Sequence, residues 1–223
     1  MNRFFFFVLS FFLVGSIGLE PTSICCGQAT EKNTLEHGTL PEKCQLFDGK
    51  TLEGWQLTSF GGEGDCHVKD GVLILEPGFP LTGITSTLDD LPTTDYEVMV
   101  EAQRAEGNDF FCGLTFPVAD SHCCLIVGGW AGATVGLSNI DDLDASRNET
   151  KKLMKFENEQ WYRIRVRVTD SKIEAWIDDE QVVDLETAGR KINLRNETLP
   201  TRPMGICAFQ SLAKIRKIEL KKW

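Results

Sequence analysis

The chain has 223 residues and a formal net charge of −10, with 23 Lys and Arg against 33 Asp and Glu. This acidic balance disfavours a nucleic-acid binder and a protein attracted to an anionic membrane surface, because both depend on clustered basic side chains. A hydrophobic content of 42% and a charged content of 25% are ordinary for a globular domain, which excludes collagen-like, disordered and coiled-coil classes.

The first 29 residues have the layout of a secretory signal peptide. A basic start precedes the apolar run 4–14, and small residues lead to a cleavage point after Ala29. The apolar run is shorter than the roughly 20 residues of a transmembrane helix. We therefore predict a signal peptide at 1–29, export to the periplasm or the exterior, and no membrane span. The sequence around Cys25 and Cys26 departs from a lipid-attachment pattern, so no lipid anchor is expected.

Residues 30–43 are polar and are interpreted as a leader, and 44–223 consists of short strand-like runs between turn signals. In the clearest run, 161–169, apolar side chains alternate with polar ones, which indicates a half-buried strand. About a dozen such runs at roughly 8- to 12-residue spacing, without a sustained helical period, predict a single all-β domain, a sandwich or a barrel. The other runs are 71–76, 95–105, 110–118, 122–127, 172–178, 181–185, 206–209 and 215–220.

Cysteine usage leaves the redox state of the domain open. In an exported protein some disulfides are plausible, and the sequence does not choose among the pairings. Cys123 and Cys124 are neighbours in an apparent strand, so their side chains should point to opposite faces. No zinc site is expected, because the histidines are scattered and no C-x-x-C pair is present. The cysteines of the domain are Cys44, Cys66, Cys112, Cys123, Cys124 and Cys207.

The segment 45–55, which contains Leu46-Phe47-Asp48-Gly49-Lys50 and ends in Gly54-Trp55, resembles the opening signature of the 3-keto-disaccharide hydrolase domain family. The resemblance continues in the same order to about residue 222. It implies a concanavalin A-like (laminin G-like) jelly-roll β-sandwich of two antiparallel sheets. It also implies exported bacterial proteins that cleave glycosides oxidised at C3. The later matching segments are 67–75, 95–101, 161–178, 204–206 and 215–220.

The sequence departs from the family pattern at its centre. An arginine of that pattern falls at Pro117, and 123–130 replaces a strand that carries a glutamate and a glutamine. The chain is therefore similar to a divergent member, and two functions stay open. One is a hydrolase or lyase-type activity on 3-keto-glycosides, and the other is a non-catalytic, lectin-like module that binds glycan on the same fold. A structural envelope protein is a third reading, supported only by the extra cysteines.

The candidate catalytic residues are two carboxylates. Removal of the leaving group from a 3-keto-glycoside needs a base near C2, because the keto group acidifies the proton there. Glu101 lies on the polar face of its predicted strand, and Asp109 opens the next strand. Carboxylates on a solvated strand face would give the same pattern.

Four residues are candidates for substrate binding: Trp130, Gln103, His122 and Trp176. Trp130 lies in a glycine-rich segment and could form a flat platform for a sugar ring, or cover the edge of the core. Trp176 could line a groove or pack on arginine stems. Gln103 shares the polar face of Glu101, and His122 is a weak candidate acid or ligand.

The densest group of oxygen ligands is 139–144, with Asn139, Asp141 and Asp144 as candidate ligands of Ca²⁺ or another divalent cation. An acidic surface loop without a metal fits the same residues. The sequons at Asn148 and Asn196 indicate surface positions.

Overall fold

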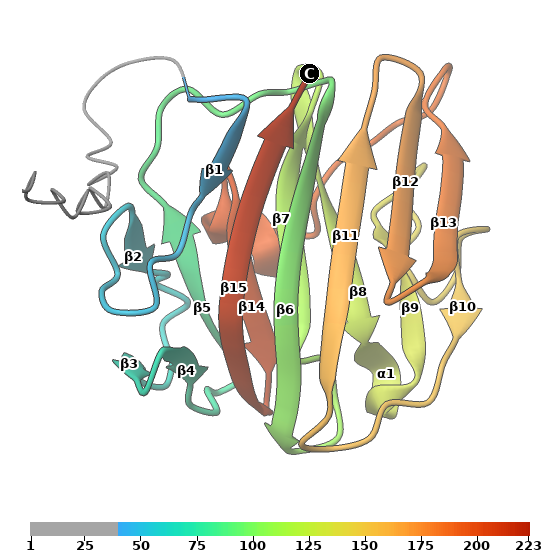
Figure 1. Ribbon diagram of the computed structural model, residues 1–223. Helices are drawn as coiled ribbons and strands as arrows, with labels where there is room; N and C mark the ends of the chain where they lie inside the picture. The colour runs from blue at the N-terminus through green and yellow to red at the C-terminus, as the bar shows by residue number, and fades with distance from the viewer. Residues whose placement is uncertain (1–39) are drawn as a thin grey trace, which may run out of the picture. The chain divides into compact units, whose positions relative to one another are not determined.

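The computed structural model describes residues 40–223 as two antiparallel β-sheets packed face to face (Figure 1). The predicted all-β jelly-roll sandwich is confirmed. The expected signal peptide and all but the last residues of the expected leader lie outside the described residues. Within residues 40–223, no helix has the length and apolar character needed to cross a membrane.

The eight-stranded sheet has the order β13-β12-β11-β6-β15-β4-β3, and β1 pairs with β15 beside β4. Its long central strands are β6 and β15, which pair over most of their lengths. The strands are β1 (Lys43–Gln45), β3 (Cys66–Lys69), β4 (Val72–Leu75), β6 (Tyr96–Glu106), β11 (Trp161–Val168), β12 (Lys172–Ile177), β13 (Glu180–Glu186) and β15 (Leu212–Lys222).

The seven-stranded sheet has the order β10-β9-β8-β7-β14-β5-β2. Of two short helical segments, α1 (Gly129–Gly132) connects β8 to β9 within this sheet, and the 3₁₀ helix η1 (Asn196–Thr201) precedes β14 on the connection from β13 of the other sheet. The strands are β2 (Trp55–Leu57), β5 (Leu81–Ser86), β7 (Cys112–Val118), β8 (Ser121–Gly128), β9 (Thr134–Ser138), β10 (Lys152–Leu153) and β14 (Gly205–Phe209).

The core lies between the two sheets and follows from the alternation of side chains along the strands. In β11 the even-numbered positions 162–168 are buried, and the odd-numbered positions that face outward include three arginines. Its partner β6 contributes Val98 and Val100, which are fully buried, and Tyr96, whose hydroxyl donates to the carbonyl of Pro117 at 2.6 Å. Each fully buried side chain of this size stabilises the fold by about 1.5–3 kcal/mol.

The family-like opening segment has a structural role. The Asp48 side chain accepts hydrogen bonds from the backbone N–H of Lys50 and Thr51, at 2.7 and 2.8 Å, and so closes a tight turn. The indole N–H of Trp55 donates to the carbonyl of Leu46 at 2.7 Å, and Trp55 is buried. This segment anchors the first strands to the sandwich.

All six cysteines of the described part of the chain are free thiols, so the disulfides considered from the sequence are not formed. Cys123 belongs to the main core and Cys124 to a smaller cluster on the other side of the sheet, which confirms their opposite directions. Burial raises the pKa of the Cys124 thiol to about 12, and burial raises that of Cys66 to the same value. Such thiols are poor nucleophiles at neutral pH.

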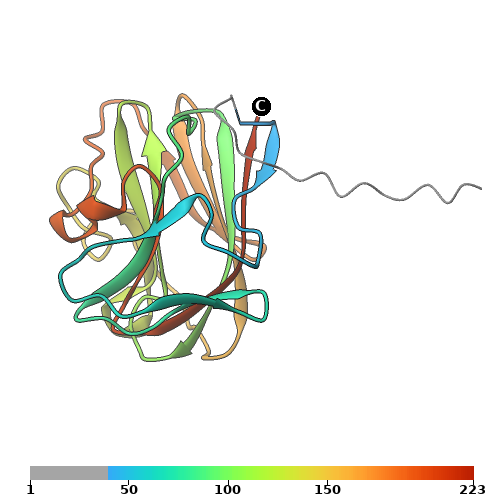
Figure 2. The same cartoon turned by 90° about the vertical axis from the view of Figure 1, so that its left-hand side faces the viewer.

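The outer face of the seven-stranded sheet is partly covered by loops. Figure 2 shows η1 on the outer side of the layer that contains β7 and β8. A second apolar cluster forms under this cover, with Cys124 and Ile126 from β8 packed against Ala145 and Leu194. The loop cover explains a wrong interpretation of one sequon: Asn148 is buried, at 6% exposed, whereas Asn196 is exposed.

Candidate functional site

A cavity of about 350 Å³ opens on the outer side of the seven-stranded sheet, and we call it the aromatic pocket. Its lining divides by chemistry into an apolar group and a polar group. The apolar group consists of Leu81, Phe110, Ile126, Trp130 and Phe209, and the polar group of Asp109, Ser138, Arg195, Glu197 and Thr198.

Small residues on the strands give this pocket its depth. Gly113 on β7 lies beneath Phe110, and a Cβ atom there would come within 3.0 Å of the Phe110 ring and of the Cys207 sulfur. The glycine therefore lets the Phe110 ring lie close to the sheet. Phe110 then packs against Phe209 with ring centroids 5.7 Å apart, which forms one apolar wall.

Trp130 is presented by a turn in an unusual backbone conformation. Gly128, Trp130, Ala131 and Gly132 all have positive φ angles, of 80°, 49°, 66° and 94°. Left-handed backbone at a non-glycine residue costs about 1 kcal/mol or more, and such residues concentrate at functional sites. The Trp130 side chain is 41% exposed, so the turn holds an indole at the mouth of the pocket.

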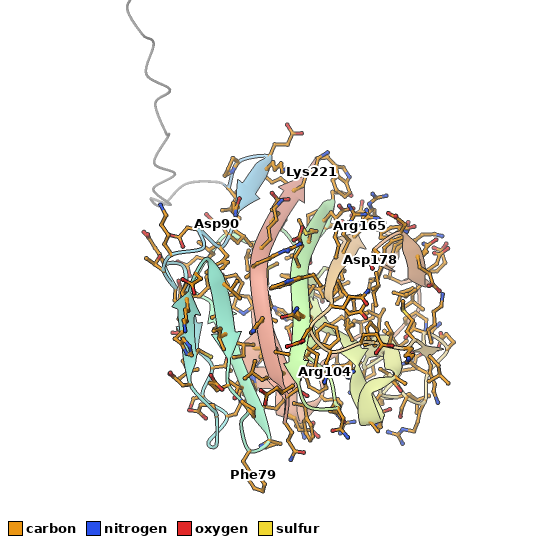
Figure 3. The ribbon with its side chains drawn as sticks, turned by 60° about the horizontal axis from the view of Figure 1, so that its bottom comes forward. Phe79, Asp90, Arg104, Arg165, Asp178 and Lys221 are labelled. Atoms are coloured by element: carbon orange, nitrogen blue, oxygen red, sulfur yellow. The ribbon has the colours of Figure 1, made fainter. Side chains whose placement is uncertain are left out.

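Asp109 supports that turn from below. Its carboxylate accepts from the backbone N–H of Phe110 at 2.8 Å and from that of Ala131 at 3.1 Å. The backbone carbonyl of Asp109 in turn accepts from Arg104 at 3.4 Å. Arg104 lies near the end of β6 on the side of α1 (Figure 3) and is 6% exposed. The Asp109 carboxylate is therefore fixed in direction beside Trp130.

Within the polar group of the lining, one arginine and one glutamate form an ion pair. Arg195 donates to both carboxylate oxygens of Glu197, at 2.7 and 3.3 Å, and to Asp144 at 3.2 Å. The hydrogen bond from Arg195 holds the pKa of Glu197 below its usual range, so Glu197 is a carboxylate at neutral pH. Sequence reasoning missed both residues. The segment 196–198 carries a sequon, which is typical of a surface loop, and only the structure shows that η1 packs back onto the sheet.

A second cavity of about 400 Å³ adjoins the first and shares Arg195 and Glu197 with it. We call it the amide pocket, because three asparagines line it: Asn139, Asn193 and Asn196. Its other lining residues are Asp142, Asp144, Arg147 and Leu194.

The acidic residues of this region are bound to cations of the protein itself. Asp144 accepts from Ser146 and binds Arg147 at 2.8 Å, and Asp141 binds Arg190 at 2.8 Å. Among residues 40–223, no group of three His, Cys, Asp or Glu side chains is arranged to hold a metal ion. Asp141 and Asp144 are therefore engaged by arginines, and Asn139 lines the amide pocket. The divalent cation stays a prediction from the sequence, and no step below uses one.

Three of the predicted site residues lie on the other sheet. Glu101, Gln103 and Trp176 point outward from the eight-stranded sheet and line neither pocket. Glu101 pairs with Arg216, and the Gln103 amide donates to the carbonyl of Glu159.

The guanidinium groups of Arg165 and Arg167 both pack on Trp176, at 4.8 and 5.1 Å from the centroid of its ring. This packing on arginines is one of the two alternatives that the sequence left open. His122 on β8 is half-buried and also lines neither pocket; burial lowers its pKa, and the cation of Arg202 adds to the shift. Of the sequence candidates, only Asp109 and Trp130 meet in the aromatic pocket.

Comparison with known proteins agrees with this architecture. Residues 43–221 match the family described as the 3-keto-alpha-glucoside-1,2-lyase-like domain. No curated protein matches the chain.

Three solved structures share the fold. A Crh5 transglycosylase in complex with NAG is 12% identical with a TM-score of 0.57, covering 83% of this chain and 86% of that chain. A structure described with endo-acting O-glycanases of the human gut microbiota is 11% identical with a TM-score of 0.53, covering 75% and 91%. The carbohydrate recognition domain of Emp46p is 14% identical with a TM-score of 0.52, covering 76% and 88%. At these identities the likeness concerns the fold alone.

Proposed function

Because the chain belongs to the family of 3-keto-alpha-glucoside-1,2-lyase-like domains, we propose that it is an exported carbohydrate-active protein that cleaves 3-keto-glycosides in the aromatic pocket. The observation that carries this proposal is the pairing of Trp130 with the fixed carboxylate of Asp109. An indole face packs against the C–H face of a sugar ring, and a carboxylate beside it can reach the ring's hydrogens.

In the proposed reaction Asp109 acts as the base. The keto group at C3 acidifies the C2 proton, which passes to the Asp109 carboxylate. The electron pair left at C2 forms a C1=C2 double bond, the bond from C1 to the glycosidic oxygen breaks, and the departing oxygen takes up a proton. Addition of water across the double bond would complete a net hydrolysis. A positioned base contributes about 10²- to 10⁴-fold to such a rate.

Arg195 is suited to the charge that develops during this step. Proton removal places negative charge on the C3 oxygen, and a fixed cation beside it stabilises that charge. The guanidinium is held by Glu197 and Asp144, so its position needs no rearrangement as the charge appears.

The test is turnover of methyl 3-keto-α-glucoside by the purified protein, followed through released methanol. We expect Asp109→Asn to reduce the rate by about 10²-fold or more. Glu101→Gln is the matched control and should retain the wild-type rate, because Glu101 lies on the other sheet. Full turnover by Asp109→Asn would exclude Asp109 as the base, and an inert wild-type protein would exclude the activity.

The alternative is a lectin-like module that binds glycan without chemistry. One observation favours it: both oxygens of Glu197 are bound by Arg195, and both oxygens of Asp109 accept backbone N–H groups. Carboxylates held in this way can bind hydroxyl groups without moving protons. Glycan binding without turnover, lost in Trp130→Ala, would support this alternative over catalysis.

Export rests on the sequence of the first 29 residues. N-terminal sequencing of the protein recovered outside the cytoplasm should start at Thr30. A start at Met1 would contradict the proposed signal peptide.

A further inference from the structure

Three apolar side chains of the aromatic pocket form one continuous strip across neighbouring strands. Phe209 on β14 is the cross-strand partner of Leu81 on β5, and its backbone N–H donates to the carbonyl of Phe110, just before β7, at 2.9 Å. The strand order β7-β14-β5 therefore places Phe110, Phe209 and Leu81 side by side, and we call these three residues the apolar strip. Neighbouring strands are about 4.8 Å apart, so the strip runs for roughly 10 Å along the pocket.

The strip begins at the proposed base. Phe110 directly follows Asp109, whose carboxylate accepts from the backbone N–H of Phe110 and from the turn that carries Trp130. Trp130 follows β8, which pairs with β7 on the side away from β14. The strip therefore leads away from Trp130 and Asp109. Under the proposed function a sugar ring lies on Trp130, and the aglycone attached to its C1 can then lie along the strip.

The polar side chains of the lining offer little to a second sugar ring. Thr198 and Ser138 are buried, and their hydroxyls donate to the Arg195 carbonyl and to the Asn139 side chain, both at 3.2 Å. The charged groups of the lining already serve the oxidised ring in the proposed reaction. An aglycone on the strip would therefore meet apolar side chains, and the hydroxyls of a sugar there would lose their hydrogen bonds with water.

An aromatic ring fits the strip better than a sugar or a small alkyl group does. The rings of Phe110 and Phe209 are tilted by 39° with their centroids 5.7 Å apart, and a third ring can pack on such a pair. It also removes more apolar surface from water than a methyl group would.

We propose that the apolar strip is an aglycone subsite for an aromatic ring, so that the preferred ligands are glycosides of phenols or other aryl alcohols. The family description fixes the oxidised glucoside and leaves its aglycone open. This inference rests on the proposed function for the position of the sugar ring on Trp130.

The experiment compares three substrates that share one oxidised ring: phenyl 3-keto-α-glucoside, methyl 3-keto-α-glucoside, and 3-keto-maltose oxidised on its non-reducing ring. Each is measured with the wild-type protein and with Phe209→Ala. We expect kcat/KM for the phenyl substrate to fall about tenfold, because its ring loses a stacking partner. The values for the other two substrates should stay within twofold. Comparison within each substrate cancels the intrinsic reactivity of its leaving group.

Phe79→Ala is the matched control, because Phe79 is 83% exposed and lines neither pocket, and it should leave all three values unchanged. Thermal melting of both variants checks the fold. An equal fall for all three substrates in Phe209→Ala, or an unchanged value for the phenyl substrate, would overturn the subsite.

A binding measurement on the wild-type protein tests the subsite without a variant and without turnover. Phenyl α-glucoside and methyl α-glucoside lack the keto group, so their C2 protons are not acidified and they are not cleaved. Isothermal titration should give a Kd about tenfold lower for the phenyl glucoside, and equal Kd values would refute the subsite.

Failure of the proposed function gives a different pattern. All three oxidised substrates would then stay intact, while the phenyl glucoside would still bind more tightly than the methyl glucoside and would lose this advantage in Phe209→Ala. The subsite would stand in that case, as part of a binding module, and the cleavage would fall.

Discussion

The two outer faces of the sandwich show how one architecture yields both a surface filled by its own side chains and a surface with pockets. On the eight-stranded sheet, long charged side chains lie across the strands and occupy the surface themselves. On the seven-stranded sheet, outward positions carry short side chains such as glycine, threonine and cysteine. The loops above them therefore enclose pockets. The difference lies in side-chain length on the outward positions, since both sheets bury an apolar inner face.

The charges of the eight-stranded face are satisfied within the face. Glu97 contacts both Arg165 and Arg167, at 3.5 and 3.1 Å, and Arg167 also approaches Glu174 at 3.9 Å. Trp176 packs against the guanidinium groups of both arginines. Both arginines still keep one buried N–H, at Nε, without a hydrogen-bond partner.

The largest effect should come from removing the anchor of the loop that covers the seven-stranded sheet. The buried Asn148 amide donates to the carbonyls of Leu137, Leu143 and Asp144, and its oxygen accepts twice from Thr150. We expect Asn148→Ala to lower the free energy of unfolding by about 3 kcal/mol, because several buried groups lose their partners. Urea denaturation measures this, and a loss below about 1 kcal/mol would show that the cover holds without Asn148. Asn196→Ala is the control and should change stability by less than about 0.5 kcal/mol.

A tryptophan pair sharpens the comparison of the two faces. Trp130→Ala should weaken binding of a 3-keto-glucoside about tenfold, because the sugar loses its platform, with little loss of stability. Trp176→Ala removes a similar area from the other face and should leave binding unchanged. Isothermal titration of both variants decides the matter, and equal losses from the two substitutions would place the ligand elsewhere.

These contrasts also mark what the sequence can predict. The fold follows from period-two patterns such as 161–169 and from the opening segment around Trp55, and both are local signals. Asp109 and Trp130 can be selected from the sequence, because each stands out within its own segment. Arg195 and Glu197 could not be selected, because their place in the pocket depends on η1 folding back onto β5 and β14, a long-range contact without a local pattern. Glu101 lies on the polar face of its strand as the alternation indicates, but alternation does not tell which of the two sheets borders the aromatic pocket.

A smaller effect is expected on the stability of the protein at low pH. The bond from Arg195 lowers the pKa of Glu197, so the pair stabilises the folded state fully above the ordinary glutamate pKa of about 4.3. Its contribution is lost as the pH falls from there through the lower value of the folded state. The melting temperature of the wild-type protein should therefore exceed that of Glu197→Gln at pH 7, and the two should converge in acid. A constant difference at all pH values would show that the charge of Glu197 is immaterial.

The smallest effect is expected on the charged face. Glu97→Gln removes the carboxylate shared by Arg165 and Arg167, and partly exposed ion pairs contribute about 0.2–1 kcal/mol. Urea denaturation gives the difference in unfolding free energy between the wild-type protein and Glu97→Gln. This difference should be smaller in 1 M salt, where the Debye length is about 3 Å. A loss above about 2 kcal/mol would mean that the face acts as a cooperative network.

The six unpaired cysteines have a consequence for how the protein can be made. A sandwich that is complete without covalent cross-links needs no oxidant or disulfide isomerase to reach its native state. The domain should therefore fold equally well in a reducing cytosol, before any transport, and dithiothreitol should leave its melting temperature unchanged. Under the proposed export, maturation would then depend on when folding occurs relative to translocation, and not on the redox potential of the destination.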